Sequence, residues 1–187
     1  MTTRRAVGIL AATTLIATVI LANWLTSTFH FVPVGFGYEA TAGTFAAGFA
    51  LAARDALQDA VGKRWMLATL AIAAAVSYAV ADPHIATASA IAFLIAELLD
   101  FAVYTPIRRK SRLGDKRWAT AVIASDAVGI VTDTVVFIGI AFGWAAVLPA
   151  MAGQLVGKAW ATLAYLVIGK VTASAVLRQS DRQSEGA

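Results

Sequence analysis

The chain has 187 residues, of which 59% are hydrophobic and only 14% are charged. A soluble domain carries about 25% charged residues, so this chain has more apolar surface than a globule of its size buries, and we expect lipid to cover the rest. The formal net charge is +4, but the basic residues gather in short loops and at the chain ends, which favours membrane orientation over nucleic-acid binding. There is no cysteine and only two histidines, which excludes disulfides and thiol catalysis, and no metal site or cofactor is expected.

The predicted elements are six membrane-spanning helices, because a span needs roughly 20 mostly apolar residues. Gly62 ends the second apolar segment, Asp82 and Pro83 end the third, and Gly143 precedes the sixth. Residues 1–172 are therefore expected to form one transmembrane domain, and residues 173–187 a polar cytoplasmic tail. The predicted spans cover residues 6–26, 40–61, 65–81, 86–107, 118–142 and 147–170.

The basic residues alternate between the two ends of these predicted helices. The loops near residues 27–39, 82–85 and 143–146 contain no Lys or Arg, whereas every other loop and both termini do. Because cytoplasmic loops carry the excess of Lys and Arg, this pattern predicts that both termini lie in the cytoplasm. The expected fold is an all-α, six-helix bundle that is multi-pass in the inner (plasma) membrane.

Several ionisable groups lie within the predicted spans, where each costs about 2.5–3.5 kcal/mol on insertion scales. Glu97 and Asp100 share one face of the fourth span, Asp133 lies in the fifth, and Gln154 and Lys158 share a face of the sixth. One interpretation is that these groups pair and hold the bundle together, with Lys158 neutralising one carboxylate. Three acids against one base leave an excess, however, which favours acids that face a hydrated cavity.

The second predicted span becomes polar toward its inner end. Arg54 and Gln58 lie four residues apart, and so do Asp55 and Asp59, so each pair shares a helix face. The membrane interface tolerates charge, so these residues are either packing groups or part of a polar site. Both interpretations stay open.

Five motifs resemble the VUT family, the queuosine precursor transporters, and the resemblance covers about residues 20–170. The run from Ala96 to Arg108, which follows the pattern ELxDFxVYxPxR, is the most specific of them. Many family members carry Gln where this chain has Glu97 and Ile130. The motifs are AGTFAAG (42–48), RDALQDAVGKRW (54–65), AELLDFAVYTPIR (96–108), DTVVFIGIAFG (133–143) and GQLVGKAW (153–160).

The resemblance implies a six-helix carrier, similar to the substrate-binding subunits of vitamin uptake systems, that takes up 7-deazaguanine precursors of queuosine. A carboxylate can accept the adjacent N1–H and exocyclic amine of such a base, an amide can bind its carbonyl edge, and an aromatic ring can stack on it. The residues expected to line the substrate site are Asn23, Arg54, Asp55, Gln58, Glu97, Asp100, Tyr104, Asp133, Gln154, Lys158 and Trp160.

Other functions remain open at this stage. The chain could carry another vitamin-like heterocycle, conduct protons or ions through its acids, or serve as a structural adaptor. No nucleophile–base pair or phosphate-binding glycine loop is present, so an enzyme is not expected. The expected partners are a small-molecule substrate and the lipid bilayer, with a homo-oligomer allowed. The sequence leaves the energy source open between protons, a separate ATPase subunit and facilitated diffusion.

Overall fold

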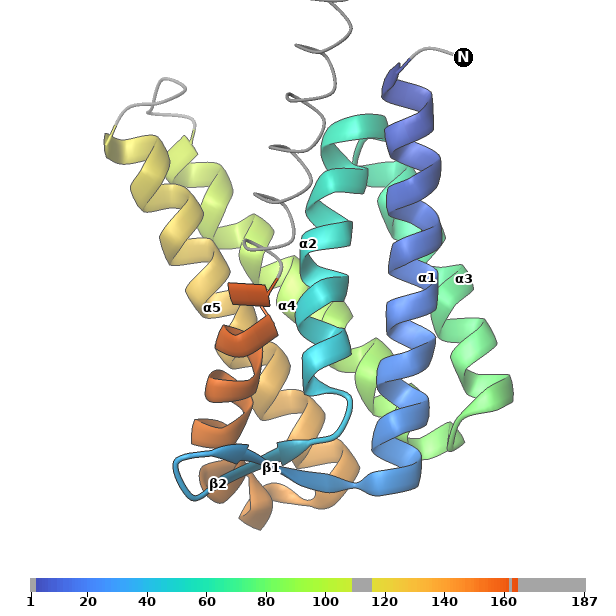
Figure 1. The fold of residues 1–187 in the computed structure, drawn as a ribbon. Helices are drawn as coiled ribbons and strands as arrows, with labels where there is room; N and C mark the ends of the chain where they lie inside the picture. The colour runs from blue at the N-terminus through green and yellow to red at the C-terminus, as the bar shows by residue number, and fades with distance from the viewer. Residues whose placement is uncertain (1–2, 109–115, 162, 165–187) are drawn as a thin grey trace, which may run out of the picture.

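The computed structural model describes residues 3–108, 116–161 and 163–164 and is mostly helical (Figure 1). The long helices run roughly side by side, and a two-stranded hairpin lies at the end of the bundle opposite the N-terminus. A further helix spans residues 147–161. The named elements are α1 (Thr3–Phe29), β1 (Phe31–Gly35), β2 (Tyr38–Thr41), α2 (Thr44–Val61), α3 (Lys63–Val80), α4 (Pro83–Arg108), α5 (Lys116–Phe142) and the short 3₁₀ helix η1 (Trp144–Ala146).

The hairpin corrects the all-α expectation, and the prediction that a helix begins at residue 40 is wrong. β1 and β2 pair antiparallel, with Phe31 opposite Thr41 and a register irregularity between Pro33 and Gly35. Gly35, Phe36 and Gly37 all have positive φ angles, a conformation that glycine adopts readily. These residues therefore build a tight turn between β1 and β2, and α2 starts after the hairpin.

The helix ends follow local chemistry. Gly62, with φ of 90°, turns the chain between α2 and α3, and Gly143, with φ of 91°, precedes η1. Asp82 stands directly before α4, and its Oδ1 accepts hydrogen bonds from the backbone N–H groups of His84 (2.9 Å) and Ile85 (3.0 Å). Asp82 is thus the N-cap of α4, where these N–H groups have no partner within the helix.

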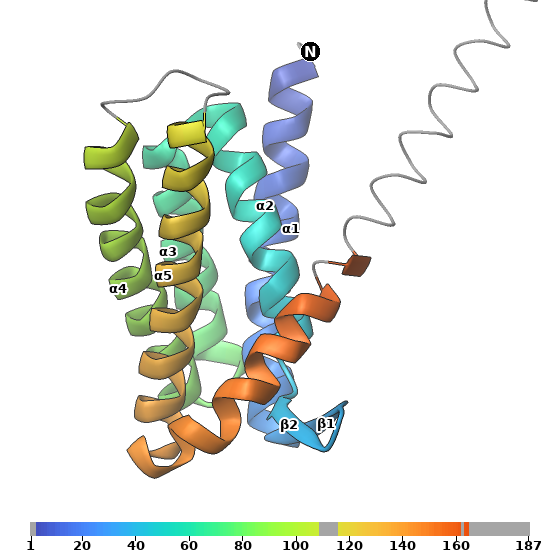
Figure 2. The ribbon, with the colours of Figure 1, turned by 90° about the vertical axis from the view of Figure 1, so that its left-hand side faces the viewer.

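Small residues allow the helix at 147–161 to lie close to its neighbours. A Cβ on Gly153 would collide with the backbone oxygen of Glu39 in the hairpin, and one on Gly157 would lie 2.7 Å from the methyl carbon of Thr44. Figure 2 shows this helix crossing the bundle obliquely beside the hairpin. Residues of β2, the start of α2 and this helix are consequently brought into direct contact.

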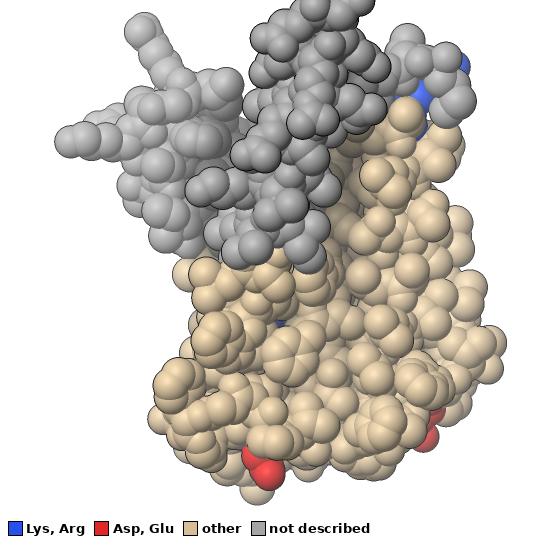
Figure 3. Space-filling view, viewed as in Figure 1, with Lys and Arg blue, Asp and Glu red and all other residues tan. Residues whose placement is uncertain are grey.

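The surface is largely apolar. Large hydrophobic side chains such as Leu10, Trp65 and Leu148 are exposed by 69%, 68% and 81%. In the face shown in Figure 3, basic atoms lie near the N-terminus and acidic atoms at the opposite end, and the described surface between them is almost entirely uncharged. This distribution suits a protein whose middle contacts lipid.

Among the described residues, one helix, Arg5–Phe29, is long and apolar enough to cross a membrane. Within α4 and α5, the shorter stretches Pro83–Leu99 and Ala127–Phe142 are also apolar. The mostly helical structure agrees with the sequence analysis. Six membrane spans with both termini in the cytoplasm remain a prediction.

Candidate functional site

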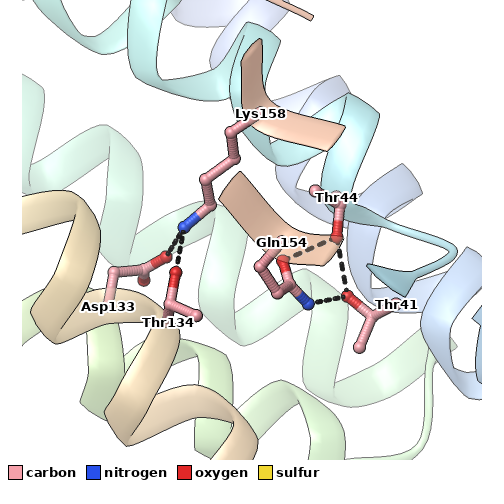
Figure 4. A network of polar contacts seen from close by, with 6 residues as sticks. All are labelled: Thr41, Thr44, Asp133, Thr134, Gln154 and Lys158. Carbon is pink, nitrogen blue, oxygen red and sulfur yellow. Dashed lines mark hydrogen bonds and ion pairs between the residues drawn. The ribbon is translucent and has the colours of Figure 1, made fainter. Parts of the chain in front are cut away.

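The centre of the site is an ion pair between two helices. Lys158, on the helix at 147–161, donates from Nζ to Asp133 Oδ2 and to Thr134 Oγ1 of α5, both over 2.9 Å (Figure 4). Lys158 and Thr134 are buried, while the Asp133 side chain keeps 26% of its surface exposed. The interpretation that Lys158 neutralises one of the acids is confirmed for Asp133.

A second polar group closes a ring of hydrogen bonds beside this ion pair. Thr44 Oγ1 donates to Gln154 Oε1 over 2.7 Å, and Gln154 Nε2 donates to Thr41 Oγ1 over 2.8 Å. The hydroxyl groups of Thr41 and Thr44 lie 3.0 Å apart and complete the ring. All three side chains are buried, so the ring fixes Gln154 one helical turn from Lys158 and leaves one amide hydrogen and one carbonyl lone pair for another partner.

A small polar cavity of about 50 Å³ lies between these groups. Asp133, Thr134, Gln154 and Lys158 line it, together with residues of α1, β2, α2 and α4. A volume of this size has room for water but not for a drug-sized molecule, since such sites usually measure about 300 Å³ or more. The helices thus surround a small polar cavity, and the partly exposed Asp133 lies in its wall.

Asn23 and Ser89 form the wall between this polar cavity and a larger one. Both residues line both cavities. Asn23 is only 3% exposed, yet no described residue hydrogen bonds to its side-chain amide. The hydroxyl of Ser89 likewise has no partner in the described part of the chain. A buried amide without a hydrogen bond is costly, so Asn23 is a natural place for a ligand or water to bind.

The larger cavity is an apolar chamber of about 280 Å³ between α1, α3 and α4. Apart from Asn23 and Ser89, every residue that lines it is an alanine, leucine, valine or phenylalanine. Phe93 is the one aromatic side chain in its wall. The chamber therefore offers apolar contact on one side and two unpaired polar groups on the other.

Glu97 is not one of the unpaired acids that the sequence predicted. Its Oε1 lies 2.7 Å from Nη1 of Arg54, and Lys63 Nζ lies 4.0 Å from its Oε2. The prediction of an unpaired Glu97 was wrong because only Lys158 was counted as a base for the acids of the spans, and Arg54 of α2 was not considered as a partner of Glu97. Glu97 and Arg54 lie two helical turns beyond Ser89 and Ala47 toward the Gly62 end, and they line neither described cavity.

The remaining expected site residues divide into three groups. Asn23 lines the cavities, as described above. Trp160 lines neither of them: its Nε1 donates to the backbone oxygen of Val34 over 3.2 Å, which holds the helix against the hairpin. Gln58 also lies outside both cavities. The side chains of Asp55, Asp100 and Tyr104 lie outside the described part of the structure.

Five polar residues that line the polar cavity were not predicted from the sequence, and one of them, Thr26, accepts a hydrogen bond from the backbone N–H of Gly43. Thr41 and Thr44 orient Gln154, Thr134 binds Lys158, and Ser89 faces both cavities. Thr and Ser are ordinary residues of membrane helices, so each one alone gives no signal. Their shared position beside Gln154 and Lys158 exists only in the folded chain.

A protein-family model described as putative vitamin uptake transporter matches residues 2–171 of this chain. The match spans all the elements that form the two cavities. No curated protein matches the chain, and no solved structure does.

Proposed function

Because the chain belongs to the putative vitamin uptake transporter family, we propose that it is a multi-pass inner-membrane carrier for a planar nitrogen base, namely a 7-deazaguanine precursor of queuosine. The proposed topology has six spans with both termini in the cytoplasm. What supports the substrate class is the resemblance of the motifs around Glu97 and Asp133 to the queuosine precursor transporters, together with the polar groups around the cavity.

One observation carries the proposal: an ion pair, a carboxamide and hydroxyl groups from separate helices meet at a cavity inside an apolar protein. Asp133 Oδ2 is engaged by Lys158, whereas Oδ1 has no hydrogen-bond partner among the described residues. A carboxylate oxygen in this position accepts the N–H donors of a guanine-like edge. The Asn23 amide, together with the remaining amide hydrogen and carbonyl lone pair of Gln154, can bind the neighbouring carbonyl and ring nitrogen.

The polar cavity is too small to hold a whole base in the conformation described. At about 50 Å³, the polar cavity admits a base only when the surrounding elements move apart or when the base extends beyond it. The hairpin contacts the helix at 147–161 through Gly153 and Trp160. It lies at the end of the bundle at which the loops lack Lys and Arg, the proposed outer side.

Uptake of radiolabelled 7-deazaguanine precursor into cells that cannot make queuosine tests the proposal. The wild-type chain is expected to support uptake, and Asp133→Asn is expected to reduce it by tenfold or more, which corresponds to about 1.4 kcal/mol of binding. Glu39→Gln is the matched control, because it removes an exposed carboxylate from the hairpin. Absence of uptake by wild-type protein that reaches the membrane would refute the proposal.

Two further measurements separate this function from the alternatives. Ion flux into liposomes without any substrate would indicate a channel. A rise in the unfolding temperature with the deazaguanine base, and none with adenine, would indicate specific binding to the folded protein and would argue against a purely structural adaptor.

A further inference from the structure

We infer that the binding site continues into the apolar chamber between α1, α3 and α4, and that it selects a neutral molecule with one hydrogen-bonding edge and an apolar body. This inference rests on the proposed function, since it concerns which planar bases the same site takes. It names the apolar chamber, Asn23 and Ser89 as determinants of specificity.

The volumes give the first argument. The polar cavity of about 50 Å³ holds water-sized molecules, whereas the chamber of about 280 Å³ approaches the size of an ordinary small-molecule site. A base that places its polar edge at Asp133 and Gln154 must therefore place its remaining atoms elsewhere. Since Asn23 and Ser89 line both cavities, the chamber adjoins the polar cavity and can hold these atoms.

The junction gives the second argument. The Asn23 side chain is 3% exposed and Ser89 is half-buried, and neither the amide nor the hydroxyl has a hydrogen-bond partner among the described residues. A lipid chain in the chamber would offer neither group a hydrogen bond. A molecule whose polar edge lies at the junction satisfies both groups and fills the chamber with its apolar part.

The chamber wall determines which substituents fit. No charged side chain lines it, so an ammonium group there would lose its hydration without gaining a counter-ion. Hydrocarbon, in contrast, gains from contact with Leu70, Ala74 and Phe93. In a 7-deazaguanine the hydrogen-bonding edge and position 7 lie on opposite rings, so position 7 points into the chamber when the polar edge faces Asp133.

Calorimetry with purified, detergent-solubilised full-length protein tests the inference. The probes are 7-deazaguanine with hydrogen, methyl, ethyl or aminomethyl at position 7. We expect each added carbon to tighten binding about fourfold, and the charged aminomethyl group to weaken it at least about tenfold. Ala74→Leu, which fills the chamber from α3, should abolish the gain from methyl and ethyl.

A control variant and a second chamber-filling variant complete the test. Ala75→Leu places the same side chain on the exposed face of α3 and should leave the whole series unchanged. Ala90→Leu fills the chamber from α4 and is expected to have the same effect as Ala74→Leu. It replaces Ala74→Leu in the test if that variant does not fold. Equal affinity for all four probes, or a gain that survives both filling variants, would overturn the inference while the proposed function stands. Failure of the unsubstituted base to bind would overturn both.

Discussion

Replacing Lys158 with methionine tests whether the buried ion pair is part of the architecture. The substitution keeps the length of the side chain and removes its charge, so Asp133 Oδ2 and Thr134 lose the partner that they bind at 2.9 Å. Removing one partner of a fully buried pair costs about 3–5 kcal/mol. Because Asp133 retains 26% exposure toward the cavity, water offsets part of the loss, and we expect about 2–3 kcal/mol.

The assay is unfolding of the detergent-solubilised protein, followed by circular dichroism. For a chain of this length, 1 kcal/mol lowers the unfolding temperature by roughly 2–4 °C, so Lys158→Met should lower it by about 5–10 °C. Arg64→Met removes a cation from the exposed start of α3 and should change the temperature by no more than about 2 °C.

A double-mutant cycle completes the test. Asp133→Asn combined with Lys158→Met removes both charges, so the double variant should lose less stability than the sum of the two single variants, by about 1–3 kcal/mol. Single effects that add within about 0.5 kcal/mol would show that the two groups do not interact. In that case the polar cluster would be a set of independent groups, and the argument for an organised binding site would fail.

Three further predictions concern other parts of the chain. Glu97→Gln weakens the charge-assisted bond to Arg54, so it should destabilise the protein by about 1.5–3 kcal/mol in thermal unfolding. Uptake per folded molecule should be unchanged, since Glu97 lines neither described cavity, and a loss of uptake at equal protein level would contradict this. Gly153→Ala should displace the hairpin backbone and reduce uptake. Gly129→Ala is the control, because there is open space around the Cβ at this position: its stability in unfolding should be unchanged or slightly higher, and its uptake should be normal. Asp82→Ala removes the cap of α4 and should cost about 1 kcal/mol in unfolding, and Asp82→Asn should restore it; equal stability of the two variants would exclude the capping role.

The sequence predicts local features of this protein well. Hydropathy and the turn residues Gly62, Asp82 and Gly143 indicate where helices end, because these residues act through their own backbone or their nearest N–H groups. The hairpin was not predicted, since residues 27–39 were expected only to form a loop between two spans. Glycine permits a break and a turn alike, and only the pairing of the flanking strands distinguishes them.

The candidate site is harder to predict because its contacts cross between helices. Helical spacing placed Gln154 beside Lys158 on one face, and both indeed line the polar cavity. Spacing within one helix contains no information about which neighbour that face meets. The pairing of Arg54 with Glu97 joins α2 to α4, and the partners of Gln154 lie more than a hundred residues earlier in the chain.

The hydrogen-bonded ring around Gln154 has a consequence for what the protein can recognise. Hydroxyl groups both donate and accept, so the amide can rotate by half a turn, exchange its nitrogen and oxygen, and keep all of its bonds once Thr41 and Thr44 reverse their hydrogens. The same amide then offers an acceptor where it previously offered a donor. A pocket built in this way adapts to tautomers of one bound molecule without any movement of its backbone. Replacing either threonine with valine would open the ring and leave the amide only one hydroxyl partner.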